Sequence, residues 1–92
     1  MRTGTTKSGF HYEYDEEIAD DMEFVELLIE VEQKPHMLPK AIEWLLGSEQ
    51  KKALYDHCRN DKGRVPVGKV ASTFEEIMSG EPELKNSEPS PA

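Results

Sequence analysis

The stretch that decides the fold runs from residue 41 to residue 77 and reads AIEWLLGSEQKKALYDHCRNDKGRVPVGKVASTFEEI. Its apolar residues recur at the three- and four-residue spacing of amphipathic helices. Gly47 interrupts this pattern once, and the turn sequence Asn60-Asp61-Lys62-Gly63 interrupts it again. The pattern therefore predicts three consecutive short helices. Their expected bounds are 38–46, 49–59 and 67–79.

Apolar side chains of these three helices are expected to face a common core, because residues three and four apart share one face of a helix. The expected inward sets are Leu38, Ala41, Ile42, Leu45 and Leu46, then Ala53, Leu54, His57 and Cys58, and finally Val67, Val70, Phe74, Ile77 and Met78. Each set is small, so the core that they build is also small.

A further helix is predicted ahead of these three, over 20–33. Asp20 or Asp21 can cap its first turn, and Lys34-Pro35 ends it. The main apolar stripe consists of Phe24, Leu27, Leu28 and Val31, and a second set, Met22, Val25 and Ile29, widens it. We therefore expect this helix to be buried over more than one narrow face.

Before residue 16 the pattern changes to the alternation of a half-buried strand. Residues 10–14 read Phe-His-Tyr-Glu-Tyr and follow the turn pair Ser8-Gly9, which predicts an amino-terminal hairpin. Residues 80–92 are rich in proline and poor in large apolar side chains, which is typical of disorder. The expected fold is mainly α: a compact bundle of about four short helices (16–79) behind a hairpin arm (1–15), followed by a disordered tail.

Charge limits the partners that this chain can have. The 92 residues carry a net charge of −8, and ten Asp and Glu residues but no Lys or Arg lie between positions 13 and 33. Such a surface repels phosphate backbones and anionic lipids, so neither nucleic acid nor membrane is expected as a partner. A single cysteine excludes an intrachain disulfide and fits the reducing cytoplasm.

No set of residues has the spacing of a catalytic or metal site. If Gly63 takes the sixth position of an EF-hand loop, Lys69 falls on the twelfth, where a carboxylate must bind calcium. His11, His36 and His57 lie on different expected elements, and Cys58 has no orienting partner at a recognisable spacing. We therefore expect a protein that is not an enzyme and holds no cofactor or metal.

Two groups of residues are candidates for contacts with other proteins. Glu23, Glu26 and Glu30 share a helix face and could bind a basic partner, although a solvated face is the simpler interpretation. Trp44 lies off the best stripe of its helix and is either a core residue or an exposed anchor. An isolated hairpin is marginal, so its aromatic residues must pack on the helices or mediate self-association. These residues are Phe10, Tyr12 and Tyr14.

In its order of elements the chain resembles the tail assembly chaperones of long, non-contractile-tailed phages and prophages. The residues that carry the resemblance lie between Ser8 and Ser79. They are the acidic helix around Asp20-Asp21-Met22-Glu23-Phe24, the Leu45-Leu46-Gly47-Ser48-Glu49-Gln50 element, the helix with His57, the Gly63-Arg64-Val65 turn, the Glu75-Glu76-Ile77 helix end and the strand start Gly9-Phe10.

This resemblance implies a non-enzymatic protein in the cytoplasm of a bacterial host. Its main partner would be the long, aggregation-prone tape measure protein, which it keeps soluble while the tail tube is built, with the tail tube protein as a possible second partner. The family also implies a longer form made by a programmed frameshift, for which Leu84-Lys85-Asn86 is the candidate position. The alternative is an acidic regulatory or DNA-mimic protein that inhibits a nucleic-acid-binding partner.

Overall fold

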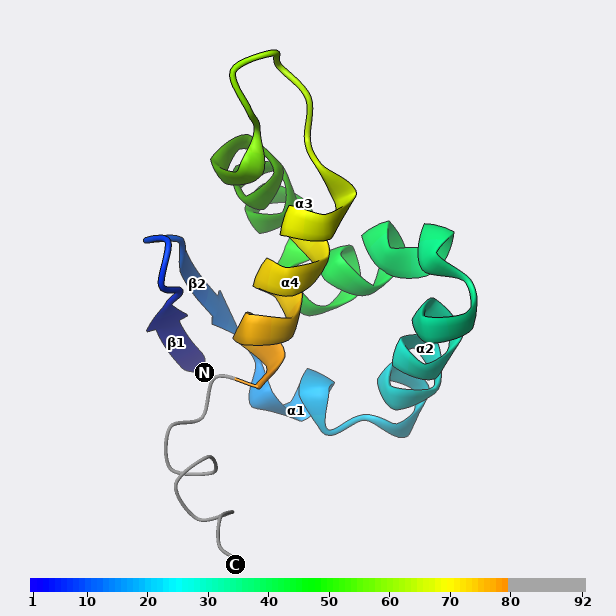
Figure 1. The fold of residues 1–92 in the computed structure, drawn as a ribbon. Helices are drawn as coiled ribbons and strands as arrows, with labels where there is room; N and C mark the ends of the chain where they lie inside the picture. Colours follow the sequence, from blue (N-terminus) through cyan, green and yellow to red (C-terminus); the bar gives the residue numbers. More distant parts are fainter. Residues whose placement is uncertain (80–92) are drawn as a thin grey trace, which may run out of the picture.

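A two-stranded hairpin leads into a group of helices in the computed structural model, which describes residues 1–79 (Figure 1). The elements are β1 (Arg2–Thr5), β2 (His11–Tyr14), α1 (Glu16–Ala19), α2 (Met22–Gln33), the 3₁₀ turn η1 (Pro35–Met37), α3 (Leu38–Cys58) and α4 (Val67–Met78). The predicted fold class, mainly helical with an amino-terminal hairpin, is confirmed. The predicted tail 80–92, and with it the frameshift position Leu84-Lys85-Asn86, lies outside the described residues.

The hairpin pairs its two strands antiparallel, with Gly4 opposite Tyr12. The backbone N–H of Thr6 donates to the Phe10 carbonyl at 2.9 Å and closes the turn. Gly9 in this turn has a φ of 97°, a value that favours glycine. Gly4 is required for a different reason, because a Cβ at this position would collide with the Tyr12 ring. The end of the Tyr12 side chain therefore covers Gly4, the residue that pairs with it.

A break at Gly47 divides α3 into two helical halves. Gly47 has φ 86° and ψ 164°, far from helical values, so two helices meet at this kink. This break is where the sequence predicts one helix to end and the next to begin. Gln50, one turn later, donates from its side-chain amide to the Leu46 carbonyl at 2.8 Å and so bridges the break.

Short-range capping explains the first helices. The Asp15 side chain accepts from the Glu17 backbone N–H, and the Asp21 side chain accepts from the Glu23 backbone N–H. Asp21 is thus the cap of α2, and the helix begins at Met22 instead of residue 20. The short α1, which was not expected as a separate helix, owes its start to the cap at Asp15.

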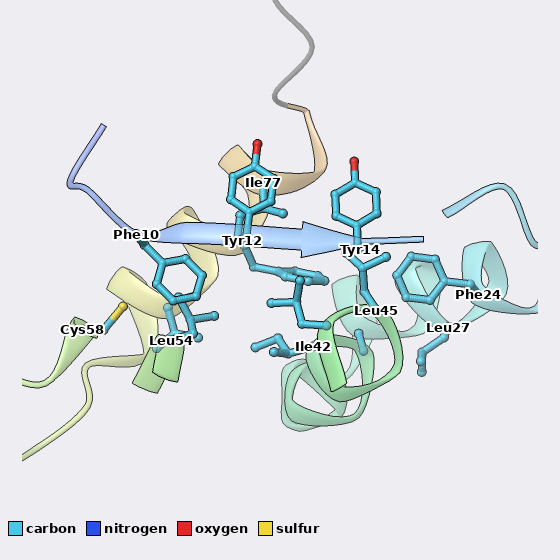
Figure 2. Packing of buried hydrophobic residues seen from close by; sticks show 14 residues of the cluster. Phe10, Tyr12, Tyr14, Phe24, Leu27, Ile42, Leu45, Leu54, Cys58 and Ile77 are labelled. Atoms are coloured by element: carbon cyan, nitrogen blue, oxygen red, sulfur yellow. The ribbon is translucent and has the colours of Figure 1, made fainter. Parts of the chain in front are cut away.

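One apolar core joins the hairpin to the helices (Figure 2). The side chains of Phe24, Ile42, Leu54, Ile77 and Cys58 are almost completely buried. In Figure 2 the labelled side chains of β2 gather over those of the helices in a single cluster. Phe10, Tyr12 and Tyr14 are buried in this cluster. The hairpin therefore packs on the helices of its own chain, and self-association would have to use a surface other than these rings.

Three expectations about inward faces were wrong. Val67 was expected on the inward face of α4, yet it is 70% exposed. Ala53 is exposed, because Leu54 and Cys58, four residues apart, already direct the second half of α3 into the core. Met22 and Ile29 were expected to widen the buried face of α2, yet they are 68% and 54% exposed. The α2 helix buries only Phe24 and Leu27 fully, so one side of its apolar surface stays in solvent.

Hydrogen bonds attach the hairpin turn to the last turns of α3 and α4. The backbone N–H of Lys7 donates to the Glu76 carboxylate of α4 at 2.7 Å, and Ser8 and His57 share a hydrogen bond of 2.9 Å. In Figure 1 the hairpin lies on one side of α4 and α2 lies on the other. The α2 surface described next is therefore well separated from the hairpin.

Candidate partner-binding surface

The exposed side of α2 carries two parallel strips of side chains. Glu23, Glu26 and Glu30, spaced by three and four residues, form what we call the acidic strip, and all three are exposed. Met22, Val25 and Ile29 have the same spacing, shifted by one residue, and form what we call the apolar strip. The identical spacing places the two strips side by side along the helix.

The carboxylates of the acidic strip are available for a partner. Among residues 1–79, none of the three takes part in an ion pair with another described residue. The ion pairs of this part of the chain use other acids, such as Glu16 with Arg2 at 3.3 Å and Glu43 with Lys51 at 2.9 Å. The negative charge of the strip is therefore not neutralised within residues 1–79.

Trp44 was expected to be either a core residue or an exposed anchor, and it is partly both. Its indole packs edge-on against the Phe24 ring, with centroids 6.0 Å apart and an interplanar angle of 62°. At the same time it is 37% exposed. Trp44 therefore supports the α2–α3 packing from the core side of α2, and it is not brought next to the acidic strip by any contact with those glutamates.

A second apolar feature, missed at the level of sequence, is a groove between α2 and α4. It has a volume of about 570 Å³. Its apolar lining comprises Leu28, Val31, Pro35, Leu38, Val67, Ala71, Phe74 and Met78. A smaller recess of about 240 Å³ shares Pro35, Leu38 and Val67 with it and continues toward Tyr55. We call the larger space the α2–α4 groove.

The signal for this groove was present in α4. Val67, Ala71, Phe74 and Met78 are spaced by four, three and four residues and therefore form one stripe. A different set on the same helix, Val70, Thr73, Phe74 and Ile77, is buried in the core. The α4 helix thus has two apolar faces, and pattern alone does not tell which one the rest of the chain covers.

A larger, polar recess of about 850 Å³ lies between the hairpin and the break in α3. Its polar groups largely bond to one another: Thr5 with His11 at 2.8 Å, and the Gln50 amide with the Glu13 backbone. Because these donors and acceptors are already paired, the recess offers a ligand less than the apolar groove does. We therefore take the α2 strips and the groove as the candidate binding surface.

Residues 1–79 contain neither a metal-binding cluster nor a membrane-spanning helix. No group of three or more His, Cys, Asp or Glu side chains could hold a metal ion there. No helix in this part of the chain is long and apolar enough to cross a membrane. Cys58 is buried, and its Sγ lies 3.9 Å from the Thr73 hydroxyl oxygen, so it packs as a core side chain.

Comparisons with protein-family models, curated proteins and solved structures found no match to this chain.

Proposed function

We propose that this protein is a non-enzymatic phage tail assembly chaperone that binds the tape measure protein and keeps it soluble during assembly of the tail tube. The observation that carries the proposal is the pair of neighbouring strips on α2, an exposed acidic strip and an apolar strip in which Met22 and Ile29 are exposed and Val25 is half-buried. The resemblance in the order of elements supplies the identity of the client. The site of action would be the cytoplasm of the bacterial host.

The two strips match what such a client requires. A long helical protein with an apolar side aggregates through that side until the tail tube encloses it. Met22 and Ile29 can cover part of an apolar stripe, and methionine adapts to varied surfaces. The carboxylates beside them, which form no ion pair within residues 1–79, add negative charge to the complex, which opposes aggregation. Many weak contacts along one client would combine into high occupancy without preventing release.

The alternative, an acidic mimic of nucleic acid, is less well supported by the same surface. A mimic of a phosphate backbone needs carboxylates spaced along an otherwise polar face. In α2 the acidic strip lies directly beside exposed Met22 and Ile29. An apolar strip in that position suits a protein client better than a DNA-binding surface.

Co-expression with the cognate tape measure protein tests the proposal. The candidate client is the product of a long neighbouring gene for an apolar, helical protein. We expect the chaperone to raise the soluble fraction of that client. Reversal of the acidic strip (Glu23→Lys, Glu26→Lys, Glu30→Lys) should weaken this effect, and added salt should weaken the wild-type interaction.

A matched control changes the net charge equally at other exposed acids: Glu17→Lys, Glu49→Lys, Asp61→Lys. This variant should solubilise the client as well as the wild type does. If both triple variants solubilise the client less than the wild type does, and to the same extent, net charge and not the acidic strip is responsible. If the wild type leaves the client insoluble, the proposed function is wrong.

A further inference from the structure

We propose that the α2–α4 groove binds an amphipathic helix. The large apolar residues of this helix would recur on one face at successive turns and would be flanked by Lys or Arg. The inference rests on the proposed function for the identity of the client, but its chemistry comes from the groove alone. The site is separate from the strips on the outer side of α2, so it would give the chaperone a second contact with the same client.

The groove has the length of a helix-binding site. Val67, Ala71, Phe74 and Met78 follow it from the first residue of α4 to the last. At a rise of 1.5 Å per residue, the 12 residues of α4 extend over about 18 Å, or roughly three helical turns. A ligand helix lying along this stripe could therefore place residues from about three successive turns in the groove.

The apolar lining is costly to leave in water. Val67 is 70% exposed although it belongs to the apolar stripe of α4. Phe74 lies where the two faces of α4 meet, and it lines the groove while packing in the core. Exposed apolar surface that forms one continuous concave area is typical of a binding site, whereas scattered apolar residues are not.

The shape of the walls favours a helical ligand. Both long walls are helices, α2 and α4, with the η1 turn at one end. A third helix can pack its side chains into the space between two others, as the grooves that bind amphipathic helices do. An extended strand would gain no backbone hydrogen bonds here, because the backbone groups of helical walls already bond within each helix.

The charge of the groove selects among such helices. Glu32 of α2 and Glu75 of α4 line it, and its lining contains no Lys or Arg. Neither carboxylate takes part in an ion pair with another residue of the described part of the chain. A Lys or Arg beside the apolar face of the ligand would meet these carboxylates, whereas an acidic helix would be repelled.

Two labelled peptides test the inference directly. Both are amphipathic helices of the same length with leucine on one face, one with lysine flanks and one with glutamate flanks. Fluorescence anisotropy with the full-length protein measures their affinities. We expect the lysine peptide to bind at least about tenfold more tightly than the glutamate peptide.

Variants then place the binding site. Ala71→Trp fills the groove, and Val67→Ser removes an exposed apolar group with little effect on the core. Both should weaken binding of the lysine peptide, Ala71→Trp by about tenfold or more. The control Ala53→Trp adds the same side chain at an exposed position of α3 outside the groove and should bind like the wild type. Circular dichroism melting checks that each variant is folded.

The outcomes separate this inference from the proposed function. Equal binding by Ala71→Trp and Ala53→Trp, or loss of binding only in the acidic-strip variant, would overturn the groove as the site. Equal affinity for the two peptides would overturn the charge selection. If the lysine peptide binds in the groove but the tape measure protein is not solubilised, the groove stands and the proposed client is wrong.

Discussion

The side-chain amide of Gln50 hydrogen bonds to both backbone groups of Glu13. Its Oε1 accepts from the Glu13 N–H at 2.9 Å, and its Nε2 donates to the Glu13 carbonyl at 2.6 Å. This amide thus takes the place that a neighbouring strand would have at the outer edge of β2. Because Nε2 also bonds to the Leu46 carbonyl at 2.8 Å, one side chain joins the hairpin to the break at Gly47.

Replacing Gln50 by Ala should therefore destabilise the fold although the helix itself prefers alanine. The variant loses both hydrogen bonds to Glu13. The partly exposed N–H and carbonyl of Glu13 must then bond to water, at a cost of about 1 kcal/mol. Urea denaturation followed by circular dichroism measures the loss. Glu49→Ala, at the neighbouring exposed position, is the control and should change stability little. Equal losses in both variants would contradict the role of the amide.

Two glycine substitutions should have opposite effects. At Gly47 the backbone φ is 86°, so Gly47→Ala should cost about 1 kcal/mol or more. Gly68 is the second residue of α4, and a Cβ there would meet no atom within 4 Å. Gly68→Ala should therefore stabilise the protein by about 0.5–1 kcal/mol through helix propensity. Thermal melting compares the two, and destabilisation by both would mean that α4 does not tolerate the added methyl group.

Stability should fall at alkaline pH through Tyr14. Burial raises the pKa of the Tyr14 phenol above its ordinary value, and the nearby Arg2 guanidinium offsets part of that rise. The folded state therefore keeps the proton more firmly than the unfolded state does. This contribution is complete below the ordinary tyrosine pKa of about 10 and is lost as the pH rises through the higher folded-state value.

The matched variant Tyr14→Phe retains the ring and removes the titrating group. Between about pH 9 and about pH 11, its free energy of unfolding should decline less than that of the wild type. Urea denaturation at each pH measures both proteins. Parallel declines would show that other groups govern the alkaline limit.

Self-association remains a prediction. Because Phe10, Tyr12 and Tyr14 are buried, the outer edge of β1 is the part of the hairpin that we expect to mediate it. The sheet of the described residues has only two strands, so β1 has one neighbour. Thr3 lies opposite Glu13, whose backbone groups point to the outer edge of β2, so the Thr3 backbone points to the outer edge of β1. Thr3→Pro removes an outward donor without removing a bond between the two strands.

Light scattering at increasing concentration should show dimers of the wild type, fewer dimers of Thr3→Pro, and no change in Thr3→Ser. Trp44→Ala tests in the same assay whether the partly exposed tryptophan of α3 also contributes to self-association. A wild type that stays monomeric at the highest concentration would remove self-association from the account.

Local signals made most of the fold predictable. Gly47 and the Asn60–Gly63 turn mark backbone changes that need particular residues, so the helices between them could be placed from sequence. The separate helix α1 was missed because it depends on a single aspartate cap, and such aspartates are frequent in this acidic chain.

The candidate site was less predictable, for a geometric reason. Helical spacing shows that α2 carries two neighbouring apolar stripes, one with Phe24 and one with Met22. It does not show that the stripe with Phe24 is the one that packs in the core. The three glutamates were found because one helix carries them all. The stripe of α4 that lines the groove could be recognised, but the arrangement that places α2 across the space from it involves distant segments and cannot be read from the periodicity of either helix.

The anchor between Lys7 and Glu76 has a consequence for the order of events during synthesis. These residues are 69 positions apart, so the hairpin turn cannot reach its partner until nearly all of the described chain has left the ribosome. At about 5–20 residues per second, Phe10 and Tyr12 stay uncovered for several seconds after they are made. The first residues translated are thus among the last to be locked in place, and nascent chains on one messenger would expose this strand to each other throughout that interval.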